Sequence, residues 1–242
     1  MVNFWHTFFF NPIYNTLVFF IDIVPGGDVG LAIILTILLV KTILLPLSIK
    51  AVKTQKAIKE IEPKIKEIKE KYKDDKQQQS LAIMEVYKEA GVNPLASIFL
   101  MFLQIPIIIA LYFAVYKGGG VVLPDINTDI LYSFIAVPQT VAMHLFGVID
   151  ITGRSLVLAV GAGITQYWHT HLTMPAPPPK KEGEEPNIKD DLMRNMHTQM
   201  KYVMPVLIAF IAYSISSVIA LYFLVSNLVT IAQEYFIIKK HR

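Results

Sequence analysis

The stretch GLAIILTILLVKTILLPLSI, residues Gly30–Ile49, decides the fold because it is apolar along its whole length except for one lysine. An α-helix rises about 1.5 Å per residue, so such a run spans roughly 30 Å, the thickness of a bilayer core. Lys41 would lie too far from either interface for its side chain to reach the headgroups easily. A lysine facing lipid there costs at least about 2.5 kcal/mol, so we expect Lys41 to face water or a partner inside the protein.

The composition predicts a polytopic membrane protein. Apolar residues make up 54% of the chain and the mean hydropathy is +0.49. The sequence contains no cysteine, which excludes disulfides and thiolate chemistry and leaves the redox compartment open. No lysine or arginine precedes Lys41, so the N-terminal segment lacks the basic region of a secretory signal.

Five segments are apolar enough to be read as membrane spans: Gly30–Ile49, Leu95–Tyr116, Ser155–Leu172, Tyr202–Ile215 and Ser217–Ile238. Residues 50–93 contain eleven lysines and the tail 239–242 is basic, whereas the loop 118–154 has few charges. The positive-inside rule therefore places residues 50–93, 173–201 and the tail in the cytoplasm, and residues 1–29 and 118–154 outside. Within 173–201, Pro175–Glu185 reads as a flexible loop.

The fourth segment, Tyr202–Ile215, is short for a span. Its 14 residues would rise about 21 Å as a helix. Such a span requires a thinned bilayer or protein neighbours at its ends. The alternative is a boundary misplaced by several residues.

Two further apolar stretches compete with this assignment. Phe4–Val24 is interrupted by Asn11-Pro12, and we predict an interfacial helix on the outer leaflet. Its apolar face would consist of Ile13, Leu17, Phe20, Ile21 and Val24. Ile130–Ile149 contains a proline, a glutamine and a histidine, and we interpret it as a surface or re-entrant segment. Counting it as a span would move the basic tail outside.

The basic segment is predicted to form a cytoplasmic helical hairpin. A narrow apolar seam recurs at spacings of three and four, at Ile58, Ile61, Ile65, Ile68 and Tyr72. Three pairs have the favourable acid-before-lysine order: Glu60/Lys64, Glu62/Lys66 and Glu67/Lys71. Pro63 should kink the first helix or begin a new one, and Lys73–Gln79 should form the turn.

The hairpin either merely connects two spans or docks a partner. Candidate docking residues are Lys50, Lys53, Lys56, Lys59, Lys64 and Lys66, and their partner could be anionic lipid, a ribosome or an incoming chain. Composition does not separate these alternatives. Sequence-specific nucleic-acid binding is excluded because no reading-helix or aromatic motif accompanies the lysines.

Polar residues inside the spans are the candidate site. Besides Lys41 they are Gln104, Gln166, His169, Tyr222, Ser226, Asn227, Thr230 and Gln233. Four of the last five recur at helical spacing and form one stripe, and such a stripe points into a bundle or an aqueous cavity. For a single serine or threonine, interhelical bonding worth roughly 0.6 kcal/mol is the alternative role.

For Lys41 we favour a functional role because no acidic residue lies well inside a span. The nearest carboxylate candidate is Glu234, near the cytoplasmic end of the fifth span. His169 and His171 are two residues apart on a helix and point to different sides, so we predict no metal site. No catalytic or phosphate-binding motif is present, so we predict neither an enzyme nor a cofactor.

Several short motifs occur in a particular order: Leu44–Leu47 (LLPL), Ile61–Pro63 (IEP), Gly91–Leu95 (GVNPL), Gln104–Ile107 (QIPI), Tyr202–Pro205 (YVMP) and Leu221–Leu228 (LYFLVSNL). With these motifs the chain resembles the YidC/Oxa/Alb family of membrane protein insertases, from about Pro12 to Lys240. The resemblance implies an all-α fold of five spans around a hydrophilic groove that is open to the cytoplasm and lipid and closed to the outside.

The resemblance also implies a role for the polar residues. Lys41 matches the family's basic groove residue, which is arginine in most bacterial members, and lysine keeps the charge but loses the bidentate fork. The implied substrates are nascent membrane proteins. The resemblance leaves open a ribosome, a signal-recognition receptor or a Sec translocon as further partners, and the short tail departs from members with long basic tails. A bacterial plasma membrane is the expected location, with an organelle membrane such as the thylakoid as the alternative.

Two rival functions remain at this point. A small ion channel or transporter would also place a lysine and polar stripes along a pathway, although the sequence shows no internal repeat. An assembly chaperone would bind membrane subunits without inserting them.

Overall fold

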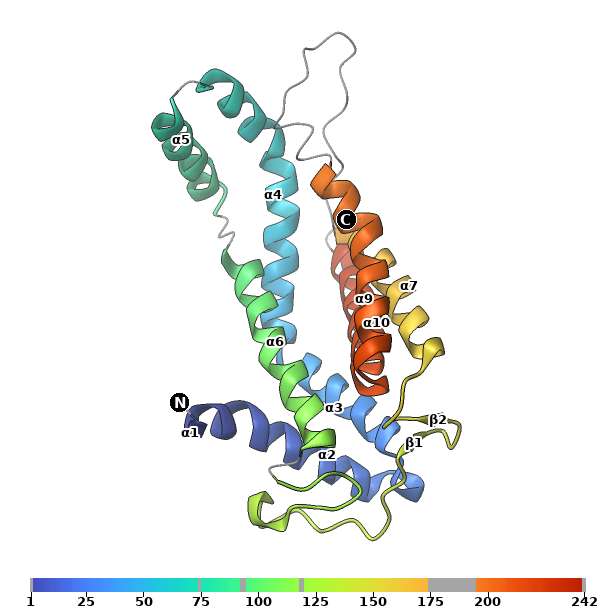
Figure 1. The fold of residues 1–242 in the computed structure, drawn as a ribbon. Helices are drawn as coiled ribbons and strands as arrows, with labels where there is room; N and C mark the ends of the chain where they lie inside the picture. Colours follow the sequence, from blue (N-terminus) through green and yellow to red (C-terminus); the bar gives the residue numbers. More distant parts are fainter. Residues whose placement is uncertain (1, 74, 92–94, 118–119, 174–194, 241–242) are drawn as a thin grey trace. The chain divides into compact units, whose positions relative to one another are not determined.

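The computed structural model describes residues 2–73, 75–91, 95–117, 120–173 and 195–240, most of which are helical (Figure 1). The expected flexible loop Pro175–Glu185 lies outside the described residues. The chain divides into two compact units, Met1–Ile43 with Ile105–Gln233, and Leu44–Gln104 with Glu234–Arg242. This composition of apolar helices with very little strand is that of an all-α membrane protein.

The first unit contains the N-terminal helices, most of the apolar helices and a two-stranded hairpin. Its elements are α1 (Val2–Trp5), π-helix η1 (His6–Phe10), α2 (Asn11–Ile23), 3₁₀-helix η2 (Pro25–Gly27), α3 (Val29–Ile43), most of α6 (Leu95–Tyr116), 3₁₀-helix η3 (Thr128–Ile130), β1 (His144–Leu145), β2 (Ile149–Asp150), α7 (Leu156–Thr173), π-helix η4 (Gln199–Val203), α9 (Met204–Ile215) and most of α10 (Ser217–Lys240). The second unit contains α4 (Leu45–Lys71) and α5 (Lys76–Glu89).

The predicted break at Asn11-Pro12 is wrong, because the helical path runs through it. A proline ring normally clashes with the carbonyl four residues earlier. Here the turn before Pro12 widens into η1, whose last bond runs from the Asn11 N–H to the His6 carbonyl, five residues back. Pro205 is preceded in the same way by η4, closed by a bond from Met204 N–H to Gln199. A single π turn therefore lets each helix continue past its proline.

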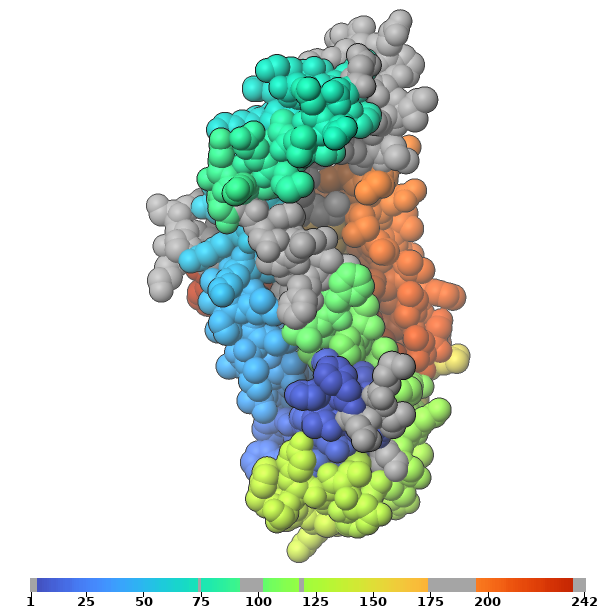
Figure 2. Space-filling view, turned by 90° about the vertical axis from the view of Figure 1, so that its left-hand side faces the viewer, coloured from blue at the N-terminus to red at the C-terminus, as the bar shows by residue number. Residues whose placement is uncertain are grey.

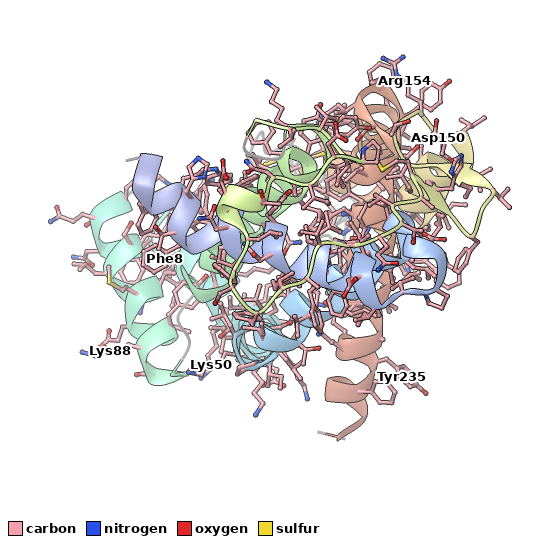
Figure 3. All side chains as sticks on the ribbon, turned by 90° about the horizontal axis from the view of Figure 1, so that it is seen from below. Phe8, Lys50, Lys88, Asp150, Arg154 and Tyr235 are labelled. Atoms are coloured by element: carbon pink, nitrogen blue, oxygen red, sulfur yellow. The ribbon has the colours of Figure 1, made fainter. Side chains whose placement is uncertain are left out.

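The apolar face of α2 is buried within the protein. Leu17 and Ile21 are at most 1% exposed, and α2 packs against α3. The predicted outer-leaflet contact through this face is therefore wrong for its buried members. The exposed apolar side chains of α2 are instead Phe19 and Ile23, and Phe8 projects from η1 (Figure 3).

Residues 120–154, here called the cap loop, contain no α-helix. This supports the surface interpretation of Ile130–Ile149, because irregular backbone cannot cross a bilayer facing lipid. The loop lies against the N-terminal helices (Figures 1 and 2). Asn15, which is 1% exposed on α2, donates to the Ile130 carbonyl at 2.9 Å and accepts from the Tyr132 N–H at 2.6 Å.

A second attachment joins the cap loop to the start of α3. The buried Asp28 carboxylate accepts from the Leu31 N–H at 2.9 Å, which caps α3, and from the Phe146 N–H at 2.7 Å. Backbone bonds run from Val29 to the Ala142 carbonyl and from Ala142 to the Gly27 carbonyl. One carboxylate thus serves both the helix N-terminus and the hairpin turn.

At the far end of the cap loop, Gly153 joins α10. The Ser217 N–H and hydroxyl both donate to the Gly153 carbonyl, at 2.9 and 3.0 Å. Asp150 and Arg154 lie at the outer edge of this segment (Figure 3). The Asp150 carboxylate accepts from the Thr152 hydroxyl and N–H, and these bonds hold its pKa below its ordinary value.

Replacing Asn15 by leucine should loosen the cap loop. The substitution leaves the Ile130 carbonyl and the Tyr132 N–H without their side-chain partner, and each such loss costs about 1–3 kcal/mol. We expect a lower thermal midpoint in detergent and faster hydrogen exchange at Tyr132. Thr16→Val is the matched control, because the Thr16 hydroxyl bonds only within α2, to Pro12. Unchanged exchange at Tyr132 in the leucine variant would contradict the role of Asn15.

The run Gly30–Ile49 is not one helix. It divides at Leu44, where α3 ends and α4 begins, and Pro46 falls in the first turn of α4. Proline fits a first turn because the missing N–H has no intrahelical partner there. A single continuous helix over this run is therefore wrong, and Lys41 lies in the last turn of α3 rather than at a helix centre.

The fourth predicted span is longer than expected. A continuous helix runs from Asn195 to Ile215, 21 residues, or about 31 Å. The alternative of a misplaced boundary is therefore correct. Polar residues such as Gln199 and Lys201 concealed this extension of the helix beyond the predicted N-terminal boundary.

Two helices in the described part of the chain are long and apolar enough to cross a membrane, Asn195–Ile215 and Ser217–Phe236. The pair α3 and α4 counts as a third only if the bend between them lies within one span, and Phe102–Tyr116 is a shorter apolar helix. Two other helix boundaries agree with prediction. α6 begins and ends at the predicted residues, and α7 is shifted by one residue at each end.

The second unit contains the predicted hairpin, in which α5 packs against α4. Pro63 lies inside α4, which changes direction towards its C-terminal end (Figure 1). The turn is shorter than predicted, because Asp75 caps α5 by accepting from the Gln77 and Gln78 N–H groups. Of the predicted ion pairs, Glu62–Lys66 is present at 3.4 Å. Lys50 and Lys88 both point away from the ribbon (Figure 3).

Candidate hydrophilic site around Lys41

Lys41 is held at the C-terminal end of α3. Its Nζ donates to the Thr230 hydroxyl of α10 at 3.1 Å, and the side chain is partly buried. The negative end of the helix dipole favours a cation in a last turn by about 0.3–1 kcal/mol. The helix break at Leu44 thus lowers the cost of placing an ammonium among apolar helices.

The stripe predicted on α10 is mostly buried. Tyr222, Ser226 and Asn227 are 2%, 6% and 7% exposed, while Thr230 and Gln233 are partly exposed. The Tyr222 side chain hydrogen-bonds Ser226. Asn227 donates to Thr165 of α7 at 3.4 Å, which links two helices in the way expected of polar interhelical contacts.

α7 contributes a third set of polar groups. His169 lies within electrostatic reach of Lys41, and Gln166 donates to Thr170 at 3.2 Å. The His171 ring instead stacks on Tyr167, with ring centroids 6.1 Å apart. The two histidines thus have different partners, as their spacing predicts.

The helix α7 also approaches its neighbours closely. A Cβ added at Gly163 would lie 2.9 Å from the Ala209 Cβ of α9, so only glycine allows this approach. Small residues at helix contacts are typical of membrane bundles. This packing fixes the separation of α7 from α9, and with it the position of the polar side chains on α7.

The structure brings together some of the predicted site residues and not others. Lys41, His169 and Thr230 come from three helices and form one cluster, which Asn227 extends through Thr165. Gln104 and the six candidate docking lysines belong to the second unit. Thr165 and Thr170 were missing from the predicted site, although both stand at helical spacing from predicted members. The part that any of these residues plays in binding stays a prediction.

The carboxylate candidate Glu234 belongs to a different unit from Lys41. It is 4% exposed and interacts electrostatically with Lys59. Among the described residues no carboxylate forms an ion pair with Lys41. That Glu234 is the nearest carboxylate candidate stays a prediction. The cluster presents a cation with a neutral hydrogen-bond partner, which is suited to attract a carboxylate from outside the chain.

Comparisons with known proteins agree with these features. The chain matches the 60Kd inner membrane protein family over residues 20–242. It is 33% identical to a membrane protein insertase YidC of Fusobacterium nucleatum, covering 88% of each chain. It is 30% identical to YidC 2 of Bacillus anthracis over 96% of this chain and 80% of that protein. It is 28% identical to the insertase MisCA of Bacillus subtilis over 97% of this chain and 79% of that protein.

These matches cover nearly the whole described fold, including the helices that hold Lys41, His169 and Thr230. The relatives are bacterial and the apolar helices are long enough to cross a bilayer, so the chain is a membrane protein of bacterial type. The chain belongs to the 60Kd inner membrane protein family, the YidC/Oxa/Alb family that its motifs resemble.

Proposed function

We propose that this chain is a membrane protein insertase that accepts hydrophobic segments of nascent proteins in a hydrophilic groove around Lys41 and releases them into the bilayer. The observation that carries the proposal is the Lys41 ammonium, which lies among apolar helices with the neutral Thr230 hydroxyl as its hydrogen-bond partner. The printed names of its relatives, membrane protein insertases, support the same function.

The proposed mechanism is charge attraction followed by partition. A substrate's polar or acidic flank would enter the groove, where Lys41 attracts its carboxylates. From the groove, the flank would have only the remaining part of the low-dielectric bilayer core to cross. The apolar segment would then leave sideways into lipid. Partition of about 20 apolar residues drives this step, and no nucleotide is required.

The groove would be lined by the polar residues of α3, α7 and α10 that belong to the first unit. Five spans would surround it, with the N-terminus and cap loop outside and the hairpin and tail in the cytoplasm, as the lysine distribution favours. The span preceding α10 would be the 21-residue helix Asn195–Ile215, which is long enough to cross without a thinned bilayer.

The cytoplasmic hairpin would be the first docking surface for the substrate. Its lysines Lys50, Lys53, Lys56 and Lys64 lie on α4, and all four are exposed. A basic surface of this kind fits anionic lipid headgroups, or the RNA surface of a ribosome from which a nascent chain emerges. A signal-recognition receptor and a Sec translocon are further candidate partners.

Site-specific photocrosslinking tests the groove. A photoreactive residue at Gln166 or Gln233 should crosslink a stalled nascent membrane protein, whereas one at Phe19, exposed on α2, should not. Equal crosslinking from all three positions would refute a groove around Lys41. Protease mapping of the substrate's translocated tail separates insertion from later assembly, and a conductance assay separates it from ion transport.

A further inference from the structure

The Thr230 hydroxyl makes two hydrogen bonds whose directions are fixed by chemistry. A lysine ammonium can only donate, so the Thr230 oxygen accepts from Lys41 at 3.1 Å. The single hydroxyl proton then goes to the Ser226 carbonyl one turn earlier, at 2.8 Å. The backbone of α10 thereby orients the hydroxyl, and the hydroxyl orients the ammonium.

This arrangement differs from that of other threonines on the same bundle. Thr36 and Thr42 on α3 also donate to the carbonyl four residues earlier, each at 2.8 Å. Such back-bonding is common for threonine in helices and explains nothing further by itself. Thr230 adds a bond to a charged side chain on another helix, 189 residues away in sequence.

The bond also leaves part of the ammonium available. A lysine ammonium has three N–H donors, and Thr230 accepts from one of them. Within the described part of the chain, the remaining donors have no recorded protein acceptor. A carboxylate has two oxygens that can accept them. Lysine lacks the rigid fork of arginine, so a fixed direction must come from a neighbouring residue.

We infer that Thr230 is a positioning residue, which holds the Lys41 ammonium so that two N–H groups face one carboxylate on the flank of an incoming substrate. The inference rests on the proposed insertase function and deepens it. In this inference, the proposed preference for substrates with acidic flanks comes from the pair Lys41–Thr230 and not from the Lys41 charge alone.

The test uses proteoliposomes that contain the purified full chain and two synthetic single-span precursors. The translocated flank carries four aspartates in one precursor and four asparagines in the other. We expect Thr230→Val, which keeps the shape and loses the hydroxyl, to slow insertion of the aspartate precursor about ten-fold, as for a lost charged hydrogen bond. Insertion of the asparagine precursor should change less than about two-fold, because a neutral flank does not use the ammonium.

Two further variants separate positioning from structure. Thr230→Ser keeps the hydroxyl and should restore the aspartate rate. Thr36→Val removes a buried hydroxyl that bonds only within α3, and should leave the ratio of the two rates unchanged. Should the valine variant not fold, Thr230→Ala gives the same comparison. Equal slowing of both precursors, or no recovery with serine, would show a structural role and overturn the inference.

Failure of the proposed function has a different signature. If Lys41→Ala leaves the aspartate rate unchanged, the charge role of Lys41 fails, and the positioning role fails with it. If Lys41→Ala slows the aspartate precursor and Thr230→Val does not, only the role of Thr230 is refuted.

Discussion

Insertion of a substrate with an acidic flank is expected to slow roughly 10- to 150-fold when Lys41 is replaced by alanine. The estimate follows from a hydrogen bond to a charged group, which contributes about 1.5–3 kcal/mol. Removal of the ammonium leaves Thr230 without its donor and leaves the cluster of α3, α7 and α10 with His169 as the remaining basic side chain among the described members. The measurement is the initial insertion rate in proteoliposomes for several substrates.

Two controls define what the alanine result means. Lys41→Arg keeps a permanent charge and several donors, so the rate should stay within a few-fold of the original. Lys88→Ala removes an exposed charge on α5, outside the candidate docking lysines, and should leave the dependence on flank charge intact. The charge-attraction mechanism is wrong if alanine at position 41 supports insertion as well as lysine does across several substrates.

Gly27→Ala is expected to cause the largest loss of stability among simple substitutions near the cap loop. Gly27 has φ +64°, and an added Cβ would lie 2.0 Å from the backbone oxygen of Thr140. A left-handed conformation costs a residue other than glycine about 1–2 kcal/mol. Overpacking adds about 1–3 kcal/mol, and here the clashing atom is backbone, so the loop itself must move.

The neighbouring glycine provides a control within the same turn. Gly26 has φ +71° but nothing within 4 Å of an added Cβ, so Gly26→Ala carries the conformational cost alone. The thermal midpoint in detergent should fall for both variants, and at least twice as far for Gly27→Ala. Similar shifts would mean that the backbone at Thr140 is not held firmly against Gly27.

Local sequence patterns predicted the helices and the polar stripe well. The apolar run and the Gly91–Leu95 motif located α6, and helical spacing placed Tyr222, Ser226 and Thr230 on one face. The bond between Lys41 and Thr230 joins two such local features. The sequence did not predict that Thr230 is the partner of Lys41, because several polar residues of the stripe could equally have faced the lysine.

The features that the sequence did not predict have particular physical reasons. The break at Leu44 and the π turns before Pro12 and Pro205 depend on how one turn adapts to a proline, which periodicity does not report. The cap loop depends on Asn15 and Asp28, single polar residues that bond backbone groups more than a hundred positions away. A lone buried polar residue gives no sequence signal of which distant backbone it binds.

The turn between β1 and β2 makes the sidedness of the protein directly measurable. Val148 is 83% exposed at this turn, and the native chain has no thiol of its own. One engineered cysteine at Val148 would therefore be the only thiol in this sequence that a membrane-impermeant maleimide dye could label on intact cells. A second cysteine variant at Leu81, 60% exposed on α5, would test the proposed cytoplasmic side of the hairpin by labelling before and after the cells are opened.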